Sequence, residues 1–153
     1  KHVVKMVLES AQLLCTAHHE LDGDRVQFKD LYKSAYKNHP CAVWARSGSG
    51  NYIWLHKLLD ELCFQYTLRY KKTHKVEMSG LLSKLSALPK NIVQSKFYEP
   101  PQCMPEQYKI VSPSLKAISP TQEAYIDYYL GEKRSFAKWQ FTKAPAWFDI
   151  YED

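Results

Sequence analysis

Six polar side chains recur along the first helical segment of the chain, at alternating spacings of three and four residues. They are His2, Lys5, Glu9, Gln12, Thr16 and His19. Because an α-helix turns by about 100° per residue, this spacing puts all six on one narrow face. A desolvated amine can act as a nucleophile, and a carboxylate as a general acid or base. We therefore treat Glu9, Lys5 and His2 as candidate catalytic residues.

The rest of this helix is apolar over most of its circumference. Such a helix is normally buried on several sides, so its polar face lines either a cavity or solvent. If it lines solvent, Lys5 and Glu9 form an ordinary surface ion pair, which contributes about 0.3–0.5 kcal/mol. The sequence leaves both alternatives open. No N-cap residue precedes Lys1, so we expect a short native N-terminal segment to be missing from this chain.

A second group surrounds the Ser-Gly-Ser-Gly turn at 47–50 and consists of His39, Arg46 and Asn51. The turn leads directly into the longest predicted helix, and the N–H groups at a helix N-terminus bind anions. Arg46 would add a planar, bidentate donor for phosphate. We predict phosphate contacts for all three residues. The alternative is an ordinary turn between two helices.

A third group lies at the other end of the same helix, where Arg69, Lys71, Lys72 and His74 follow one another closely. Basic side chains near a helix end commonly contact nucleic-acid phosphates, so we predict such contacts here. The structural alternative is that these cations complement the negative end of the helix dipole.

Aromatic residues are concentrated at the end of the chain, with nine of them between 120 and 151. Lys133, Arg134, Lys138 and Lys143 are interleaved with them. Aromatic platforms with basic neighbours suit an exposed base or a single strand. Aromatics at helical spacing more often belong to a core, and the sequence does not decide between these two roles.

These groups must be positioned by helices, and the periodicity predicts a mainly α fold. We expect one compact helical domain over 1–153, with a long proline-rich loop at 89–118 and an aromatic tail at 144–148. A short strand is expected at 25–28. The expected helices span 3–19, 29–37, 40–46, 51–72, 78–88, 120–130 (ending at Gly131) and 133–139.

The composition is mildly basic, with a formal net charge of +5 and a pI of about 8.9. This is compatible with a nucleic-acid or nucleotide partner. The four cysteines are too widely spaced for a compact metal site, no His-x3-His pair occurs, and we expect neither a metal nor another cofactor. Cys15 and Cys63 lie beside leucines in helical patterns, which indicates buried thiols and a reducing compartment. We expect no signal peptide, no membrane span and no membrane partner.

Three stretches of the chain resemble an uncharacterised protein family common in phages. They are Lys-His-Val-Val-Lys-Met-Val-Leu-Glu-Ser-Ala-Gln-Leu-Leu at 1–14, His-Pro-Cys-Ala-Val-Trp-Ala-Arg at 39–46 and Phe-Ala-Lys-Trp at 136–139. Asn51-Tyr52 and Trp54-Leu55 add to the resemblance, which covers nearly the whole chain. It implies no particular activity, but it does imply the cytoplasm of an infected bacterial host.

More distantly, the layout is similar to that of the phage-type pyrimidine-dimer DNA glycosylases, which are small, basic helical proteins. In that family an amine attacks the sugar C1′ to form a Schiff base, and a glutamate on an early helix assists. The resemblance implies that Glu9 is this glutamate and that Arg69 and Tyr70 belong to the basic helix end. The family's nucleophile is the N-terminal α-amine, which has no counterpart here. The amine would lie in the missing segment or come from Lys1 or Lys5.

Three functions follow from these patterns: a DNA glycosylase/lyase, a non-catalytic module that binds a nucleotide or nucleic acid, and a phage protein that binds a host protein. The environment of Glu9 separates the first two. A buried Glu9 in a cleft with Lys5 and His2 favours an enzyme. An exposed Glu9 beside an open basic face favours the binding module. The sequence does not indicate the oligomeric state.

Overall fold

The computed structural model describes residues 1–112 and 117–149, and within them the chain is all-α, with no strand. The prediction of a mainly α fold is therefore confirmed. Contacts divide the chain into two compact units, Lys1–Tyr98 (unit 1) and Glu99–Asp153 (unit 2). The expectation of a single domain stays a prediction.

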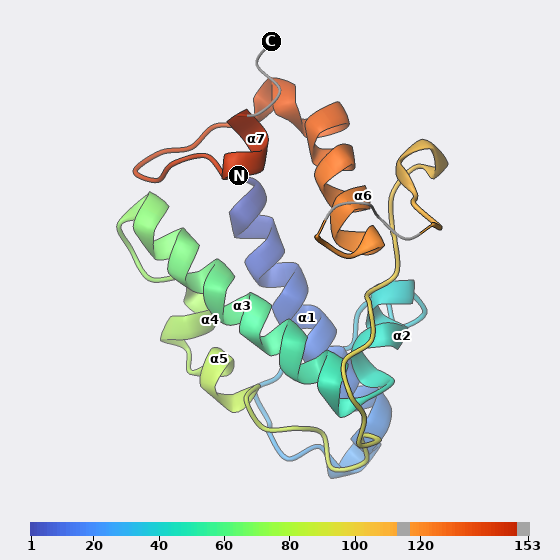
Figure 1. Ribbon diagram of the computed structural model, residues 1–153. Helices are drawn as coiled ribbons and strands as arrows, with labels where there is room; N and C mark the ends of the chain where they lie inside the picture. Colours follow the sequence, from blue (N-terminus) through green and yellow to red (C-terminus); the bar gives the residue numbers. More distant parts are fainter. Residues whose placement is uncertain (113–116, 150–153) are drawn as a thin grey trace. The chain divides into compact units, whose positions relative to one another are not determined.

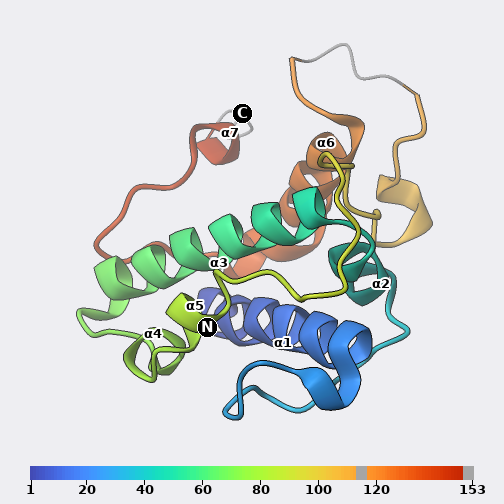
Figure 2. The ribbon, with the colours of Figure 1, turned by 90° about the horizontal axis from the view of Figure 1, so that it is seen from below.

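Unit 1 is built on two long helices, α1 (His2–Asp22) and α3 (Ser49–Tyr70). They lie side by side and run in opposite directions (Figures 1 and 2). The start of α1 meets the end of α3, where the Lys1 α-amine lies 3.1 Å from the Tyr70 hydroxyl. Three shorter helices complete the unit: α2 (Pro40–Arg46), α4 (Lys75–Met78) and α5 (Leu81–Lys84).

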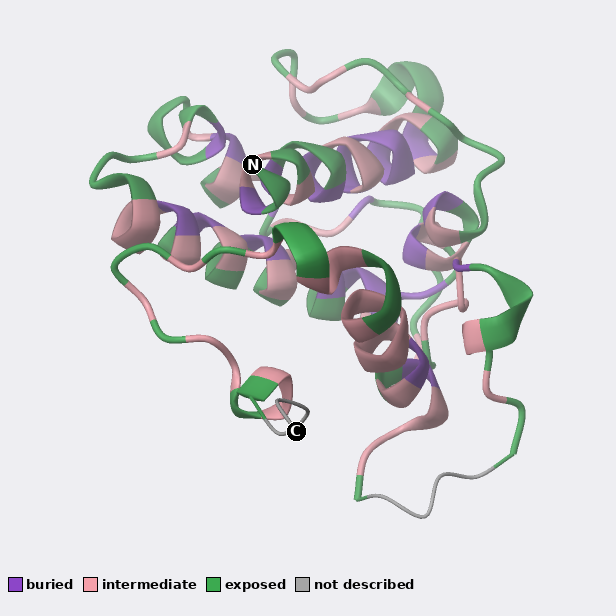
Figure 3. Cartoon of the chain, turned by 90° about the horizontal axis from the view of Figure 1, so that it is seen from above, coloured by how far each residue is buried: buried purple, intermediate pink, exposed green. Residues whose placement is uncertain are grey.

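The core of unit 1 lies between α1 and α3, and the shorter helices pack around it. Its fully buried side chains include Val7, Leu14, Leu59, Val76 and Leu85. Figure 3 shows buried residues concentrated in α1, α2 and α3. Burial of this apolar surface is the main term that stabilises the helix pair, at about 25 cal/mol per Å².

A buried hydrogen-bonded chain ties the end of α1 to the start of α3. The Tyr52 hydroxyl donates to the carbonyl oxygen of Leu85 at 2.8 Å. It therefore accepts from Nε2–H of His18, also at 2.8 Å. Both rings are almost fully buried. Beside them, the buried Asp22 carboxylate accepts from the backbone N–H groups of Lys90 and Asn91, at 2.9 and 3.0 Å.

We predict that the stability of the fold decreases at acidic pH because of His18. Burial lowers its pKa below the ordinary 6.5, although Asp22 partly opposes this shift. The unfolded chain thus binds a proton more tightly, and the unfolding free energy falls as pH drops below about 6.5. Glutamine at this position retains an N–H donor for Tyr52 but does not titrate. Urea unfolding at about pH 7.5 and 5.5 measures this effect. The decrease in unfolding free energy between the two pH values should be smaller for His18→Gln than for the wild type.

An equal decrease in unfolding free energy on acidification in the two proteins would contradict this role of His18. Some pH dependence should persist in the variant, because burial also lowers the pKa of His74.

Two segments of unit 1 differ from the sequence prediction. The strand at 25–28 and the helix at 29–37 are absent, and this segment is a loop after a single 3₁₀ turn, Gly23–Arg25. The backbone groups of Tyr32 and Ala35 bond to side chains of α1, and these bonds take the place of hydrogen bonds within a local helix. Of the helix predicted at 78–88, only α5 is helical beyond Met78, because Gly80 adopts a left-handed conformation with φ of 79° and α4 ends before it.

Unit 2 contains α6 (Pro120–Tyr128), which Ser119 caps by accepting from the backbone N–H of Gln122 at 3.1 Å. The helix continues as a π-helical segment, Tyr129–Lys133, so Gly131 does not end it as predicted. The helix predicted at 133–139 is only a 3₁₀ turn, Arg134–Phe136. The short helix α7 (Ala146–Asp149) lies in the aromatic tail.

The predicted proline-rich loop is confirmed over 89–112, where the only helical turn is the 3₁₀ segment Glu106–Tyr108. Residues 113–116 of that loop lie outside the described residues. No helix in the described part of the chain combines the length and the apolar character needed to cross a lipid bilayer.

Candidate functional site

The polar face of α1 is divided into a structural half and an exposed half. Thr16 and His19 belong to the first. Thr16 Oγ1 accepts from the backbone N–H of Ala35 at 3.0 Å, and Nε2–H of His19 donates to the carbonyl oxygen of Tyr32 at 2.9 Å. These bonds hold the extended segment 31–36 along α1. This half of the polar face therefore binds backbone rather than a ligand.

His2, Lys5 and Glu9 form the exposed half. All three are among the described residues, and no ion pair joins Lys5 to Glu9 there. The Glu9 side chain is exposed to water and lines neither of the two depressions described below. The catalytic roles proposed for Glu9, Lys5 and His2 stay predictions, but Glu9 lacks the buried setting that would favour an enzyme.

Lys5 instead lines a depression of about 660 Å³ between α1, the segment 31–36 and the start of α4. We call it the basic groove. Three lysines and one histidine line it, contributed by three separate segments, and no carboxylate does. The complete lining is Val4, Lys5, Leu8, Gln12, Tyr32, Lys33, Ser34, Ala35, His74 and Lys75.

The position of His74 in the groove is fixed by its role as the N-cap of α4. Its Nδ1 accepts from the backbone N–H of Val76 at 3.1 Å, and its ring packs edge-on against Tyr66, with centroids 4.7 Å apart. Burial lowers its pKa, so the ring is neutral at pH 7. Because Nδ1 is an acceptor in this cap, the neutral ring carries its proton on Nε2, where it can donate.

The predicted basic residues at the end of α3 lie at the same end of unit 1 as the start of α1, as the contact between Lys1 and Tyr70 shows. Lys71 ends the helix in a left-handed conformation with φ of 54°, and both Lys71 and Lys72 are exposed. Arg69 donates to the Gln65 side chain at 3.4 Å. The structure thus brings these residues, His74 and Lys5 to one end of unit 1.

The second predicted group is built differently from the expected anion site. The first N–H groups of α3, from Ser49 and Gly50, donate to the carbonyl oxygens of Val93 and Ser95 at 2.8 and 3.1 Å. The chain itself therefore occupies the donors that we expected an anion to use. Asn51 is buried, donates to the carbonyl oxygen of Trp44 at 3.0 Å, and accepts from the N–H of Tyr98 at 2.8 Å.

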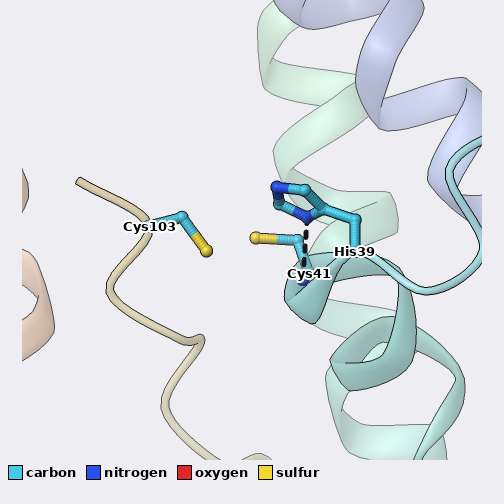
Figure 4. Close-up of side chains that lie close together, drawn as sticks. All are labelled: His39, Cys41 and Cys103. Atoms are coloured by element: carbon cyan, nitrogen blue, oxygen red, sulfur yellow. Dashed lines mark hydrogen bonds between the residues drawn. The ribbon is translucent and has the colours of Figure 1, made fainter.

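His39 and Arg46 also make structural contacts. His39 is the N-cap of α2, and its Nδ1 accepts from the backbone N–H of Cys41 at 3.1 Å (Figure 4). Cys103, also drawn there, belongs to unit 2. Arg46 donates to the carbonyl oxygen of Lys37 at 2.7 Å. These contacts are sufficient to explain both residues, and their phosphate-binding roles stay predictions.

A second depression of unit 1 has the opposite charge. Asp60, Glu61 and Glu77 line it, together with Cys63, Phe64 and Thr67. Burial is the main reason why the pKa of Cys63 rises to about 11, and burial also raises that of Cys15 to about 11. Both thiols are buried as predicted and stay protonated at neutral pH.

In unit 2 the described aromatic side chains at 120–149 are half-buried or exposed, and none is fully buried. Tyr128 stacks on Tyr129 with centroids 5.9 Å apart, and the Lys133 ammonium lies 4.9 Å from the Tyr128 ring centroid. The predicted aromatic tail is held by a contact between Trp139 and Phe148, with ring centroids 4.4 Å apart. Tyr151 lies outside the described residues.

Comparison of the chain with family models, with curated proteins and with solved structures gave no match. The resemblance to a phage family and to the pyrimidine-dimer glycosylases therefore stays a prediction. Any functional conclusion must rest on the geometry of the site.

Proposed function

We propose that this protein is a nucleic-acid-binding module that holds backbone phosphates in the basic groove. The observation that carries the proposal is the lining of the groove, where Lys5, Lys33 and Lys75 converge from three segments without a carboxylate among them. Cations gathered in one depression whose lining contains no carboxylate attract a polyanion, since field lines are focused in depressions lined by one sign of charge.

The groups present are suited to phosphate oxygens. Lysine ammonium groups bind phosphates as point charges, without demanding one fixed geometry. His74 adds a neutral N–H donor whose ring is fixed by its capping bond to Val76. Lys71 and Lys72 extend the positive charge at this end of unit 1. Such contacts position a strand without reading its sequence.

We predict a measurable salt dependence. Three lysine–phosphate contacts to a single strand give a slope of log K against log[salt] of about −2, from about −0.7 per phosphate. Each of Lys5→Gln, Lys33→Gln and Lys75→Gln should weaken binding and make the slope shallower by about 0.7. Fluorescence anisotropy with a labelled oligonucleotide over a range of salt concentrations measures both quantities.

Lys57→Gln is the matched control, because Lys57 is an exposed lysine of α3 that does not line the groove. It should leave the slope unchanged. If Lys57→Gln and Lys5→Gln had equal effects, binding would reflect net charge alone and the groove would lose its role. Affinity that does not depend on salt would overturn the proposal.

A glycosylase/lyase is the second candidate, and one observation favours it: Lys5 lines the groove that we assign to the strand. Such an enzyme would form an imine between the Lys5 amine and the sugar C1′, with loss of water from the aldehyde of an abasic site or with cleavage of the glycosidic bond and release of a damaged base. Borohydride reduces an imine to a stable amine, so a trapped adduct that maps to Lys5 would show that the module is an enzyme. Glu9→Gln should then abolish turnover. The exposed position of Glu9 favours the non-catalytic module.

A further inference from the structure

We propose that the basic groove selects an unpaired strand and seats one base on its apolar floor. This inference rests on the proposed phosphate-binding function and adds the class of nucleic acid. The lining contains an apolar group beside its lysines: Val4 and Leu8 from α1, and Tyr32 and Ala35 from the segment 31–36.

Leu8 is the central observation. It is 41% exposed, although it lies on a helix whose other leucine and valine side chains are buried or half-buried. Leaving this surface in water forfeits the hydrophobic gain of about 25 cal/mol per Å². The flat face of a nucleobase would cover it, while the attached phosphates reach Lys5, Lys33 and Lys75. One ligand then covers the apolar surface and also neutralises the lysine charges.

The segment 31–36 contributes an aromatic ring to this lining, that of Tyr32. Tyr32 is held through its own carbonyl oxygen, which accepts from His19 at 2.9 Å, and its ring is half-buried. Desolvation raises the pKa of its hydroxyl, so the ring stays uncharged at neutral pH. An aromatic ring in the same lining as Leu8 is suited to contact with a base, because every base has a π-face.

The floor also offers a polar group. Gln12 lines the groove and is half-buried, and its side-chain amide makes no hydrogen bond to the described residues. An amide is both donor and acceptor, as are the edges of the bases. In a duplex these edges are paired and the bases are stacked inside. A duplex would therefore touch only the lysines, and the floor would stay uncovered.

The test compares three probes of equal length on the full chain: a single-stranded oligonucleotide, its duplex, and a strand in which every residue is abasic. The abasic strand presents the same phosphates without bases. We expect the wild type to bind the single strand at least about fivefold more tightly than either other probe, the low end of what one base contact contributes. Leu8→Ser should lower the affinity for the single strand to about that for the abasic strand, which removes the preference.

Ile53→Ser is the matched control, because Ile53 is 44% exposed on α3 and does not line the groove. It should preserve the preference. Equal affinity for all three probes, with the lysine variants still weakened, would overturn the base site and leave phosphate binding intact. Binding that no groove lysine affects would instead overturn the proposed function, and the base site with it. The comparison of probes on the wild type decides the question even if Leu8→Ser does not fold.

Discussion

Replacing Gly50 with alanine is expected to destabilise the protein by about 3 kcal/mol or more, even though alanine is the better helix former. A Cβ atom at this position would lie 2.3 Å from the carbonyl carbon of Lys96 and 2.4 Å from the backbone nitrogen of Phe97. Both are backbone atoms and cannot rotate away. Relief requires the segment 93–98 to move, which breaks its bonds to Ser49 and Asn51. The gain in helix propensity, about 1 kcal/mol, is too small to offset this.

Urea unfolding of Gly50→Ala and Gly80→Ala measures the effect against a control. Gly80 has a φ of 79°, but a Cβ atom added there would have no neighbouring atom within 4 Å. Alanine at this position therefore meets only backbone strain of about 1–2 kcal/mol. A smaller loss for Gly50→Ala than for Gly80→Ala would mean that the segment 93–98 does not lie over the start of α3. That result would also reopen this helix terminus as an anion site.

The helices with strong periodicity were predicted well, because the spacing of apolar residues within each segment identifies its buried face. The expected helices at 3–19, 40–46 and 51–72 correspond to α1, α2 and α3, with ends displaced by three residues or fewer. The helix predicted at 29–37 was wrong, and the reason is physical. Its backbone is bound by Thr16 and His19, and this contact between distant residues outweighs a weak local preference for helix.

The candidate site could be predicted only in part. Lys5 and His74 were each selected by a separate local argument, and the fold places both in the basic groove. Lys33 and Leu8 were missed because the segment 31–36 was not expected to lie along α1. A signal was present, since Thr16 and His19 continue the polar face beyond the proposed catalytic group and needed partners of their own.

The start of α3 shows why spacing alone overestimates anion sites. The sequence contained the glycine-rich turn, the arginine and the long helix, all within 46–70. It did not indicate that the segment 93–95 would supply carbonyl oxygens to Ser49 and Gly50. A helix N-terminus is available to a ligand only if no other part of the chain satisfies its donors first.

The second large effect is expected for Tyr52→Phe, which should lower the unfolding free energy by about 2–4 kcal/mol, since each buried group left unsatisfied costs about 1–3 kcal/mol. The variant keeps the ring and its packing but removes a hydroxyl that lies between His18 and the carbonyl oxygen of Leu85. Two buried groups then lose their partners at once. Urea unfolding near neutral pH, where His18 is neutral, isolates this loss from protonation.

Tyr66→Phe is the control, since Tyr66 lies on the same helix and is also buried, but its hydroxyl makes no hydrogen bond within the described residues. It should change stability by less than about 0.5 kcal/mol. Combining Tyr52→Phe with His18→Leu removes the orphaned imidazole and should recover part of the loss, because replacing both partners by apolar groups is less costly than removing one. Equal losses for Tyr52→Phe and Tyr66→Phe would mean that the buried chain does not join α1 to α3. The alignment of these two helices places Lys5 in one depression with His74 and Lys75, which follow α3 in the chain, so the same measurement also tests the framework of the basic groove.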